Sequence, residues 1–575
     1  MYKFFMHSCY MKKDDFDVVI VNEKRAIPNE DGTIKFENAL NFIENPKRSY
    51  FIHKEKYRNY KYKIEYVDKD ECDEFVCYNK DLERDLKNKL NIFSNSFMPL
   101  RELCKSPYIY GADVPIEVLV KIKYLQNLKD VKILQPYTFS SLDLEVSVFG
   151  GDEIIISSFC FNRTVYCGIF DKFLYKPTDK KDVDGNIITE KANLDDVIET
   201  VQKEIGDYLN RFNLKVEFKV CSTELELIYW TLKNMHESKA DFCGTWNMPY
   251  DIPKIISRLK VHSINPEDAF CHPDVPKKYR YAYYKVDKSH VDHYTDSWDW
   301  FHCAGYTQQI DSMRLYSRMR KVKGREPTYR LGAISEKEIG HGKLDLPNTH
   351  YYNQKYNFLY YIAYNIVDAG NVWLMEEKNH DVMSMLQLVS YSRIEDFAKQ
   401  SVMLKNDFYK YCLDRNKISG TVGPKMGTDF DNLIGKAGGT VLPPYLAKDM
   451  GLQCVKERPN LHTLVNIFIK DIDASSMYPN TMIGFNISKE TTRATIIKLF
   501  KQYKQLDGSY SEYKDMPNQD IEELFSGMIA STENALLLGN KYFNLPTPEE
   551  LLNLYNDWFR NRQSMSEDEI FKSLD

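Results

Sequence analysis

The chain has 575 residues, of which 43% are hydrophobic and 28% are charged, and its formal net charge is −6. This length predicts several domains, and the composition excludes a disordered chain because enough apolar side chains are present to bury sizeable cores. No run of about 18 apolar residues occurs, so we expect no membrane span, and the balance of 77 basic and 83 acidic residues excludes nucleic-acid binding by overall charge alone, although not by a local basic channel.

The first half of the chain predicts a succession of short elements. Residues 1–135 alternate aromatic-rich runs with charged turns, which predicts a mixed α/β domain of no evident chemistry. Residues 136–162 place strand-like runs on both sides of Gly150 and Gly151, which predicts a β-hairpin. The polar, turn-rich stretch 173–191 predicts a surface loop. Thr223 opens T-E-L-E, a capping-box pattern that predicts a helix through 225–239.

Further along, A-D-F-C-G-T-W-N at 240–247 predicts a short buried strand, followed by a helix at 251–260. Residues 262–310 are rich in Pro, His and aromatic residues and predict an insertion or extended hairpin, whose Cys and His spacings fit no common zinc module. A helix is predicted at 355–376, with helical patterns continuing to about 416. A Gly-rich linker, a strong strand at 463–472 and a mostly helical tail from about 490 complete the chain.

Three acidic motifs stand out within these elements. Asp143 and Glu145 lie two apart on a predicted strand, so both side chains point to one face, where a divalent cation would relieve their repulsion. Asp251 follows N-M-P-Y at a strand-to-helix junction. Tyr364 and Asp368 are four apart on a predicted helix and share a face. Taken singly, the first motif is better explained as a solvated strand face and the third as a helix-surface pair beside a buried aromatic residue, whereas a plain helix cap explains Asp251 equally well.

The order of the three motifs carries more information than any one of them. A strand D-x-E, then N-x-x-Y-D, then Y-x-x-x-D resembles the exonuclease domain of family B DNA polymerases, in its tyrosine-bearing form. The segment 311–345 resembles the region before the third motif in tailed-phage replicative polymerases. In that register the first motif is Asp143 and Glu145, the second is Asn247 with Tyr250 and Asp251, and the third is Tyr364 with Asp368.

The resemblance implies a 3′→5′ proofreading exonuclease with two Mg²⁺ or Mn²⁺ ions, which would clamp the attacking and leaving oxygens of the phosphodiester. Asp143, Glu145 and Asp368 are expected to hold the first ion, and Asp251 is expected to help hold the second. Tyr364 is expected to position the attacking water. Asn247 and Tyr250 are expected to contact the single-stranded 3′ end of DNA.

A second resemblance begins at residue 463. The segment I-F-I-K-D-I-D-A-S-S-M-Y-P-N resembles motif A of the same family, in which Asp473 would bind metal and Tyr478 would exclude a 2′-hydroxyl. Asp471 is the competing register, and the D-x-x-S-x-Y-P spacing favours Asp473. Binding of the dNTP is assigned to a short run of residues: Ala474, Ser476, Met477 and Tyr478. Gly438 and Gly439 resemble the glycine motif along which template DNA passes, although a plain loop explains them equally well.

The family's motifs B and C do not follow Asp473, so the resemblance implies that this sequence carries one of the two acid groups that a polymerase site needs. We expect the N-terminal half of a split polymerase, the alternative being a truncated gene product. Its partners would be primer–template DNA and a C-terminal chain with fingers, motif C and thumb, and a sliding clamp is a further candidate. Two other functions stay open: a stand-alone single-strand exonuclease with a vestigial palm, and a non-catalytic subunit that binds primer–template.

We therefore expect a mixed α+β multidomain protein that contains an RNase H-like exonuclease domain with a central mixed sheet. The expected divisions are an N-terminal domain at 1–135, the exonuclease domain at 136–376, a helical linker to the palm at 377–455, and a partial palm with motif A and a helical tail at 456–575. The cysteines are scattered without C-x-x-C, which favours a reducing cytoplasm, that of the host cell if the protein is viral.

Overall fold

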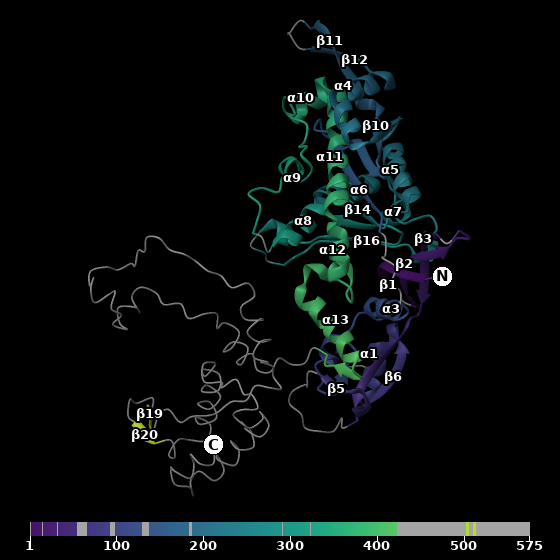
Figure 1. Cartoon of the computed structure of the whole chain (residues 1–575), viewed down its shortest axis with the longest axis vertical. Coiled ribbons are helices and arrows are strands. Elements are labelled where there is room, and N and C mark those ends of the chain that lie inside the picture. Colours follow the sequence, from purple (N-terminus) through teal and green to yellow (C-terminus); the bar gives the residue numbers. More distant parts are fainter. Residues whose placement is uncertain are drawn as a thin grey trace. The chain divides into compact units, whose positions relative to one another are not determined.

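The computed structural model describes residues 2–13, 15–31, 33–54, 66–92, 98–128, 137–182, 187–289, 291, 293–321 and 324–421, together with two short paired strands, β19 (Gln502–Lys504) and β20 (Tyr510–Glu512). The chain divides into two compact units, Met1–Gly423 and Pro424–Asp575. The described residues form a mixed α/β structure with 13 α-helices and several sheets, as predicted (Figure 1). None of the described helices combines the length and the apolar character needed to cross a bilayer.

The N-terminal part contains two small sheets. Antiparallel strands in the order β1-β2-β3 form the first sheet: β1 (Tyr2–Lys12), β2 (Asp17–Pro28) and β3 (Ile34–Glu44). The second sheet has the order β6-β4-β7: β4 (Lys47–His53), β6 (Cys72–Tyr78) and β7 (Ile109–Tyr110). A separate pair joins β5 (Tyr66–Asp68) to β18 (Lys417–Ser419). The helices of this part are α1 (Leu82–Lys89), α2 (Leu100–Leu103) and α3 (Ile116–Gln126).

A six-stranded mixed sheet forms the centre of the unit, in the order β13-β10-β9-β8-β14-β17. Its strands are β8 (Phe139–Val146), β9 (Ile154–Phe161), β10 (Thr164–Phe170), β13 (Lys215–Cys221), β14 (Phe242–Thr245) and β17 (Gln308–Asp311). Strands β8, β9 and β10 form an antiparallel meander, while β14 runs parallel to β8 and β17 runs parallel to β14. The predicted hairpin at 136–162 is confirmed, and Gly150 and Gly151 form its turn at φ of +97° and +83°, which L side chains rarely adopt.

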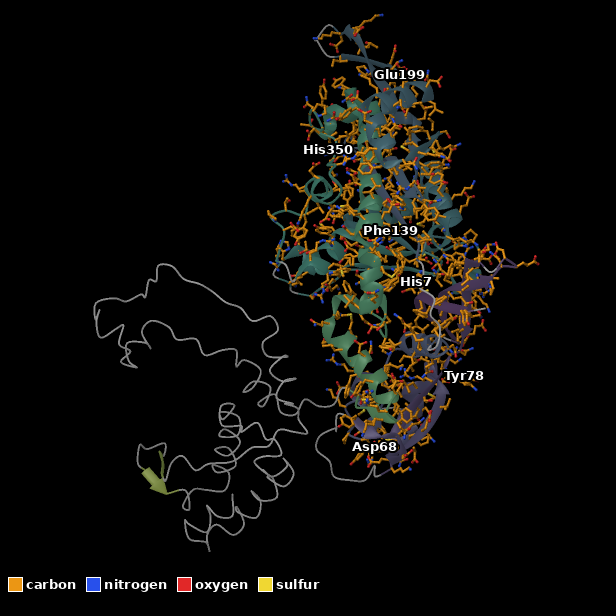
Figure 2. All side chains as sticks on the ribbon, viewed as in Figure 1. His7, Asp68, Tyr78, Phe139, Glu199 and His350 are labelled. Atoms are coloured by element: carbon orange, nitrogen blue, oxygen red, sulfur yellow. The ribbon has the colours of Figure 1, made fainter. Side chains whose placement is uncertain are left out.

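Helices cover both faces of this sheet. On one face, α11 (Phe358–Asn379) packs against β8, β9 and β10 and against α4 (Leu194–Phe212). On the other face, α5 (Glu224–Ser238) packs against β9 and β10, and α6 (Met248–Val261) shares a core with them. Side chains fill the space between these layers, as the buried Phe139 illustrates (Figure 2).

Alternation along β8 explains why its acids face α11. Leu142 and Leu144 are buried in the core formed with α5 and α6. Because successive side chains of a strand point to opposite faces, Asp143 and Glu145 must point to the α11 face. The same apolar pattern that buries one side of β8 therefore aims both carboxylates at the other side.

The remaining elements lie between β14 and β17, between β17 and α11, or after α11. They are α7 (Pro266–Phe270), β15 (Ala282–Lys285), β16 (Trp300–Cys303), α8 (Ser312–Arg320), α9 (Leu331–Ile339), α10 (His350–Tyr356), α12 (Asp381–Leu388) and α13 (Gln400–Leu413). Strands β15 and β16 pair antiparallel, so the hairpin predicted within 262–310 is confirmed.

Two predictions of local structure need adjustment. The surface loop predicted at 173–191 is wrong, because β11 (Tyr175–Lys181) and β12 (Ile187–Lys191) pair as an antiparallel hairpin. Both strands are largely exposed, so they lack the apolar alternation by which a strand is recognised. Only one of the two hydrogen bonds of the predicted capping box forms at the start of α5. Thr223 Oγ1 accepts from Glu226 N at 3.1 Å, but the Glu226 carboxylate accepts from Ser222 N rather than from Thr223 N.

Candidate metal centre

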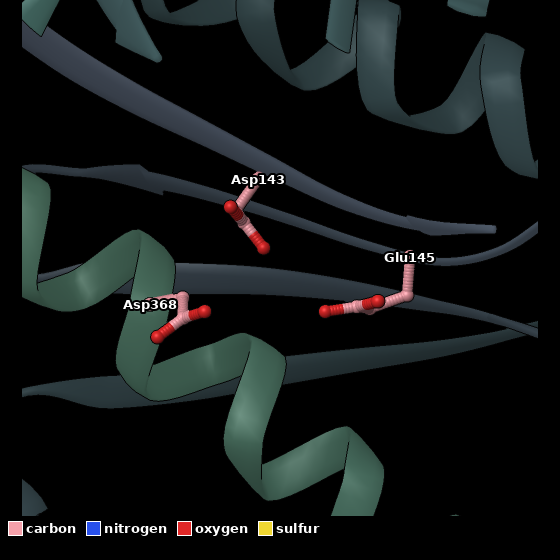
Figure 3. Close-up of side chains that lie close together, drawn as sticks. All are labelled: Asp143, Glu145 and Asp368. Carbon is pink, nitrogen blue, oxygen red and sulfur yellow. The ribbon is translucent and has the colours of Figure 1, made fainter. Parts of the chain in front are cut away.

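Helix α11 adds a third carboxylate to the pair on β8. Asp368 is 1% exposed, and one ligand oxygen from each of Asp143, Glu145 and Asp368 lies within 4.8 Å of the other two (Figure 3). Within the residues that the structure describes, this is the one group of three or more His, Cys, Asp or Glu side chains that converges in this way. The first and third motifs of the sequence thus meet in space.

Two hydrogen bonds fix α11 on β8 and so determine the spacing of the acids. Ser141 Oγ donates to the carbonyl oxygen of Ala369 at 2.6 Å. Trp373 Nε1 donates to the carbonyl oxygen of Phe139 at 3.0 Å. Because Ser141 and Ala369 lie beside Asp143 and Asp368 in the chain, the helix cannot slide along the strand without breaking these contacts.

Asp251 lies near this group but outside it. It sits in the first turn of α6, is 5% exposed, and its charge contributes to the raised pKa of Asp143. The placement follows from the sheet, since β14 is the parallel neighbour of β8 and leads directly into α6. The start of α6 is held in turn by Asp311, whose Oδ2 accepts from Met248 N at 3.1 Å.

Tyr364 and Lys343 complete the surroundings of Asp368. Lys343 Nζ donates a short hydrogen bond to Asp368 Oδ2 and another, of 3.0 Å, to the hydroxyl oxygen of Tyr364. Tyr364 is 8% exposed, and its common contact with Lys343 places it on the same face of α11 as Asp368, as predicted. Sequence reasoning missed Lys343, because a single lysine in the G-H-G-K segment belongs to no periodic pattern.

Two further side chains of α11, also missed from the sequence, contact the acids of β8. Asn365 Nδ2 donates to Asp143 Oδ2 at 2.6 Å, and the Tyr361 hydroxyl donates a short hydrogen bond to Glu145 Oε2. Tyr361 and Asn365 are one turn apart, which places them on the same helical face. Each strand carboxylate therefore has its own hydrogen-bond donor from the helix.

The electrostatics of the site are those of crowded, desolvated carboxylates. Burial, followed by the charges of Asp368, Asp251 and Glu145, raises the pKa of Asp143 well above its usual range. Burial is also the main reason that the pKa of Glu145 rises to about 8 and that of Asp368 to about 6. Burial alone would lower the pKa of Lys343, but the charges of Asp368 and Asp143 raise it above the ordinary value.

These residues fit a divalent cation. The Oδ1 atom of Asp368 is buried and has no hydrogen-bond partner, although a buried carboxylate oxygen without a partner is costly. All three converging side chains offer hard oxygen ligands, which suit Mg²⁺ and Mn²⁺. A cation among them would replace their mutual repulsion with attraction.

The other predicted site residues divide into two sets. Asn247 and Tyr250 are both exposed near the start of α6, and Tyr250 is 48% exposed. The proposed polymerase residues all lie outside the described residues, so their predicted roles stay predictions: Gly438, Gly439, Asp473, Ala474, Ser476, Met477 and Tyr478.

In comparisons with known proteins, the sequence matches no protein-family model and no curated protein.

Proposed function

We propose that this chain is a metal-dependent 3′→5′ DNA exonuclease that forms the proofreading part of a family B DNA polymerase. The observation that carries the proposal is the convergence of Asp143, Glu145 and Asp368 from two distant motifs onto one site. The predicted motifs required that these three acids meet, and an unrelated set of solvated acids would have no reason to do so.

The strand order gives independent support. The order β10-β9-β8-β14-β17, with an antiparallel meander followed by two parallel strands, is the arrangement expected of an RNase H-like sheet. In this interpretation β13 is an additional strand beside β10. The acids lie on the central strand and on the helix that packs across it, where this class of nuclease is expected to carry them.

The chemistry would be divided among the residues of the chain. A divalent cation held by Asp143, Glu145 and Asp368 supplies charge neutralisation at the scissile phosphate. Tyr364 presents a hydroxyl within the site that can hydrogen-bond and orient water, and Lys343 holds that hydroxyl. Lys343 also adds a positive charge beside Asp368, where a phosphate would bring negative charge.

Exposed aromatic side chains would bind the single-stranded 3′ end. Tyr250 is 48% exposed, Phe149 is 43% exposed and Tyr351 is 51% exposed. Phe149 lies in the turn after β8 and contacts Tyr351 edge to face, with ring centroids 5.2 Å apart. Such rings can stack on bases without regard to sequence, as proofreading of any mismatch requires.

The polymerase part of the proposal rests on the sequence around Asp473. Motif A would bind Mg²⁺ and a dNTP, and the second acid group would come from a partner chain that carries motifs B and C. Primer–template DNA is then the common substrate of both sites.

Degradation of a labelled, mismatched primer in the presence of Mg²⁺ tests the exonuclease. The double variant Asp143→Ala/Glu145→Ala should lose degradation, because two of three cation ligands are removed. A matched control is Glu199→Ala/Asp207→Ala, which removes two exposed acids from α4 (Glu199 is labelled in Figure 2) and should leave degradation unchanged. Equal degradation by the wild type and the Asp143/Glu145 variant would sink the proposal.

A second arm tests polymerisation. The candidate partner chain and dNTPs are added, and primer extension is followed. Asp473→Ala should abolish extension while sparing degradation. Extension that survives this substitution would contradict the assignment of motif A.

A further inference from the structure

Tyr361 links a metal ligand to the protein surface. Its side chain is fully buried on α11, and its hydroxyl donates to Glu145 Oε2. The same hydroxyl lies 2.7 Å from Nδ1 of His350, an exposed residue at the first position of α10. Among the described residues, Tyr361 is the only side chain that hydrogen-bonds to the carboxylate of Glu145.

The direction of both hydrogen bonds follows from the number of protons. A phenol has one proton, and once a divalent cation binds, Glu145 is an ionised carboxylate that can only accept. The Tyr361 proton therefore points to Glu145, and the phenol oxygen accepts from His350 Nδ1–H. The ring of Tyr361 also stacks parallel on Tyr364, with centroids 5.7 Å apart and 1° between the planes. The hydroxyl is thus held from two sides and has little freedom to turn away from Glu145.

Helix α10 is itself anchored to the end of β8. Gln354 Nε2 donates to the carbonyl oxygen of Val146 at 2.8 Å, and Gln354 Oε1 accepts from Val148 N at 2.9 Å. The N-cap Thr349 accepts from Tyr352 N at 3.2 Å, which fixes the first turn that carries His350. The helix that supplies His350 is therefore tied to the strand that supplies Glu145.

We propose that Tyr361, held by His350, is a positioning residue that orients Glu145 and thereby sets the affinity of the site for its divalent cation. The inference rests on the proposed function and deepens it. It separates the roles of the two stacked tyrosines: Tyr361 acts on a cation ligand, whereas Tyr364 contacts Lys343 and the space beside Asp368. Residues that hydrogen-bond to metal ligands typically change metal affinity or activity by about 10- to 100-fold when they are removed.

The test is the binding of Mn²⁺ alone to the full chain, measured by isothermal titration calorimetry without DNA. Tyr361→Phe keeps the ring and its stacking but removes the hydroxyl, and its dissociation constant for Mn²⁺ should rise by about 10- to 100-fold. Tyr360→Phe is the matched control, because the neighbouring Tyr360 hydroxyl donates to the carbonyl oxygen of Asp345 at 2.8 Å, away from the acids. Its dissociation constant should equal that of the wild type.

His350 provides a second, surface-accessible test that does not depend on the folding of Tyr361→Phe. His350→Ala should weaken Mn²⁺ binding in the same direction but by less, because water can take the place of the imidazole. His350→Asn retains a donor and should bring the dissociation constant back toward the wild-type value. With saturating Mn²⁺, degradation by Tyr361→Phe should recover most of the wild-type rate, because all cation ligands remain.

The outcomes separate the inference from the proposed function. Wild-type Mn²⁺ binding no tighter than that of Asp143→Ala/Glu145→Ala would overturn both. A wild type that binds Mn²⁺ and degrades primer, beside a Tyr361→Phe variant that binds like Tyr360→Phe, would overturn the positioning role alone. Identical Mn²⁺ binding by the wild type, His350→Ala and His350→Asn would show that His350 takes no part in positioning Glu145.

Discussion

Glu145→Gln should change the pH dependence of stability in the metal-free protein. Burial is the main cause that raises the pKa of Glu145 from 4.5 to about 8. Across that range the folded state keeps a proton that the unfolded state has released. The stability of the wild type must therefore fall as pH rises from about 4.5 to about 8. Glutamine keeps the size of the side chain and an oxygen that can accept from Tyr361, but it has no charge to desolvate.

The magnitude follows from the proton count. One proton held by the folded state alone costs about 1.4 kcal/mol of stability for each pH unit, so the wild type should lose up to about 2.7 kcal/mol between about pH 5 and pH 7. Glu145 keeps partial exposure, so we expect less than this upper limit, about 1–2.5 kcal/mol. For a unit the size of Met1–Gly423, a change of 1 kcal/mol shifts the melting temperature by roughly 1 °C. The advantage of the variant in melting temperature should therefore grow by about 1–3 °C over this interval.

Thermal unfolding followed by tryptophan fluorescence in EDTA measures this difference. Glu199→Gln on the exposed face of α4 is the control, and its difference from the wild type should stay constant with pH. Saturating Mn²⁺ should reverse the order at about pH 7, because only the wild type retains Glu145 as a ligand. A melting-temperature difference between Glu145→Gln and the wild type that does not increase with pH in EDTA would refute the reasoning.

Three further predictions concern activity. Lys343→Met removes the charge that holds down the pKa of both Asp143 and Asp368, so the rising limb of the pH–rate profile should move to higher pH, and an unmoved limb would contradict this. Tyr364→Phe should keep the stacking on Tyr361 but lower the rate of primer degradation at saturating Mn²⁺ by about 100-fold or more. The affinity for Mn²⁺, measured by calorimetry, should not change. A variant that changes only in Mn²⁺ affinity would contradict the proposal that Tyr364 orients the attacking water. Tyr250→Ala should weaken binding of a single-stranded 3′ end by about 5- to 150-fold in fluorescence anisotropy, because one stacked base is worth about 1–3 kcal/mol. Equal weakening for blunt duplex would point away from stacking.

The sequence was informative wherever a local period fixes the direction of a side chain. The alternation in S-L-D-L-E-V placed Asp143 and Glu145 on one face of a strand, and the four-residue spacing did the same for Tyr364 and Asp368 on a helix. The glycine pair at 150–151 predicted the hairpin turn that these two residues form. Each of these predictions depends on neighbours within a few residues, which act whatever the rest of the chain does.

The exposed hairpin β11–β12 shows where this local information ends. Its strands bury no apolar face, so the sequence shows no alternation of apolar and polar residues there, and it predicted a loop. The same holds for the cap of α5, where the choice of Glu226 between Ser222 and Thr223 depends on backbone geometry rather than on residue type.

By itself, then, the sequence determined which carboxylates face the same way and in what order they occur. The resemblance led us to expect that Asp368 would meet Asp143 and Glu145, but only the tertiary structure decided how they meet, that Asp251 lies outside their group, and which partners they have. Tyr361 and Asn365 became part of the site because α11 packs across β8, and Lys343 because the segment before α10 reaches Asp368 on α11. Such contacts join residues that are far apart in the chain. They depend on how whole helices and strands pack, and a pattern of neighbouring residues does not predict that packing.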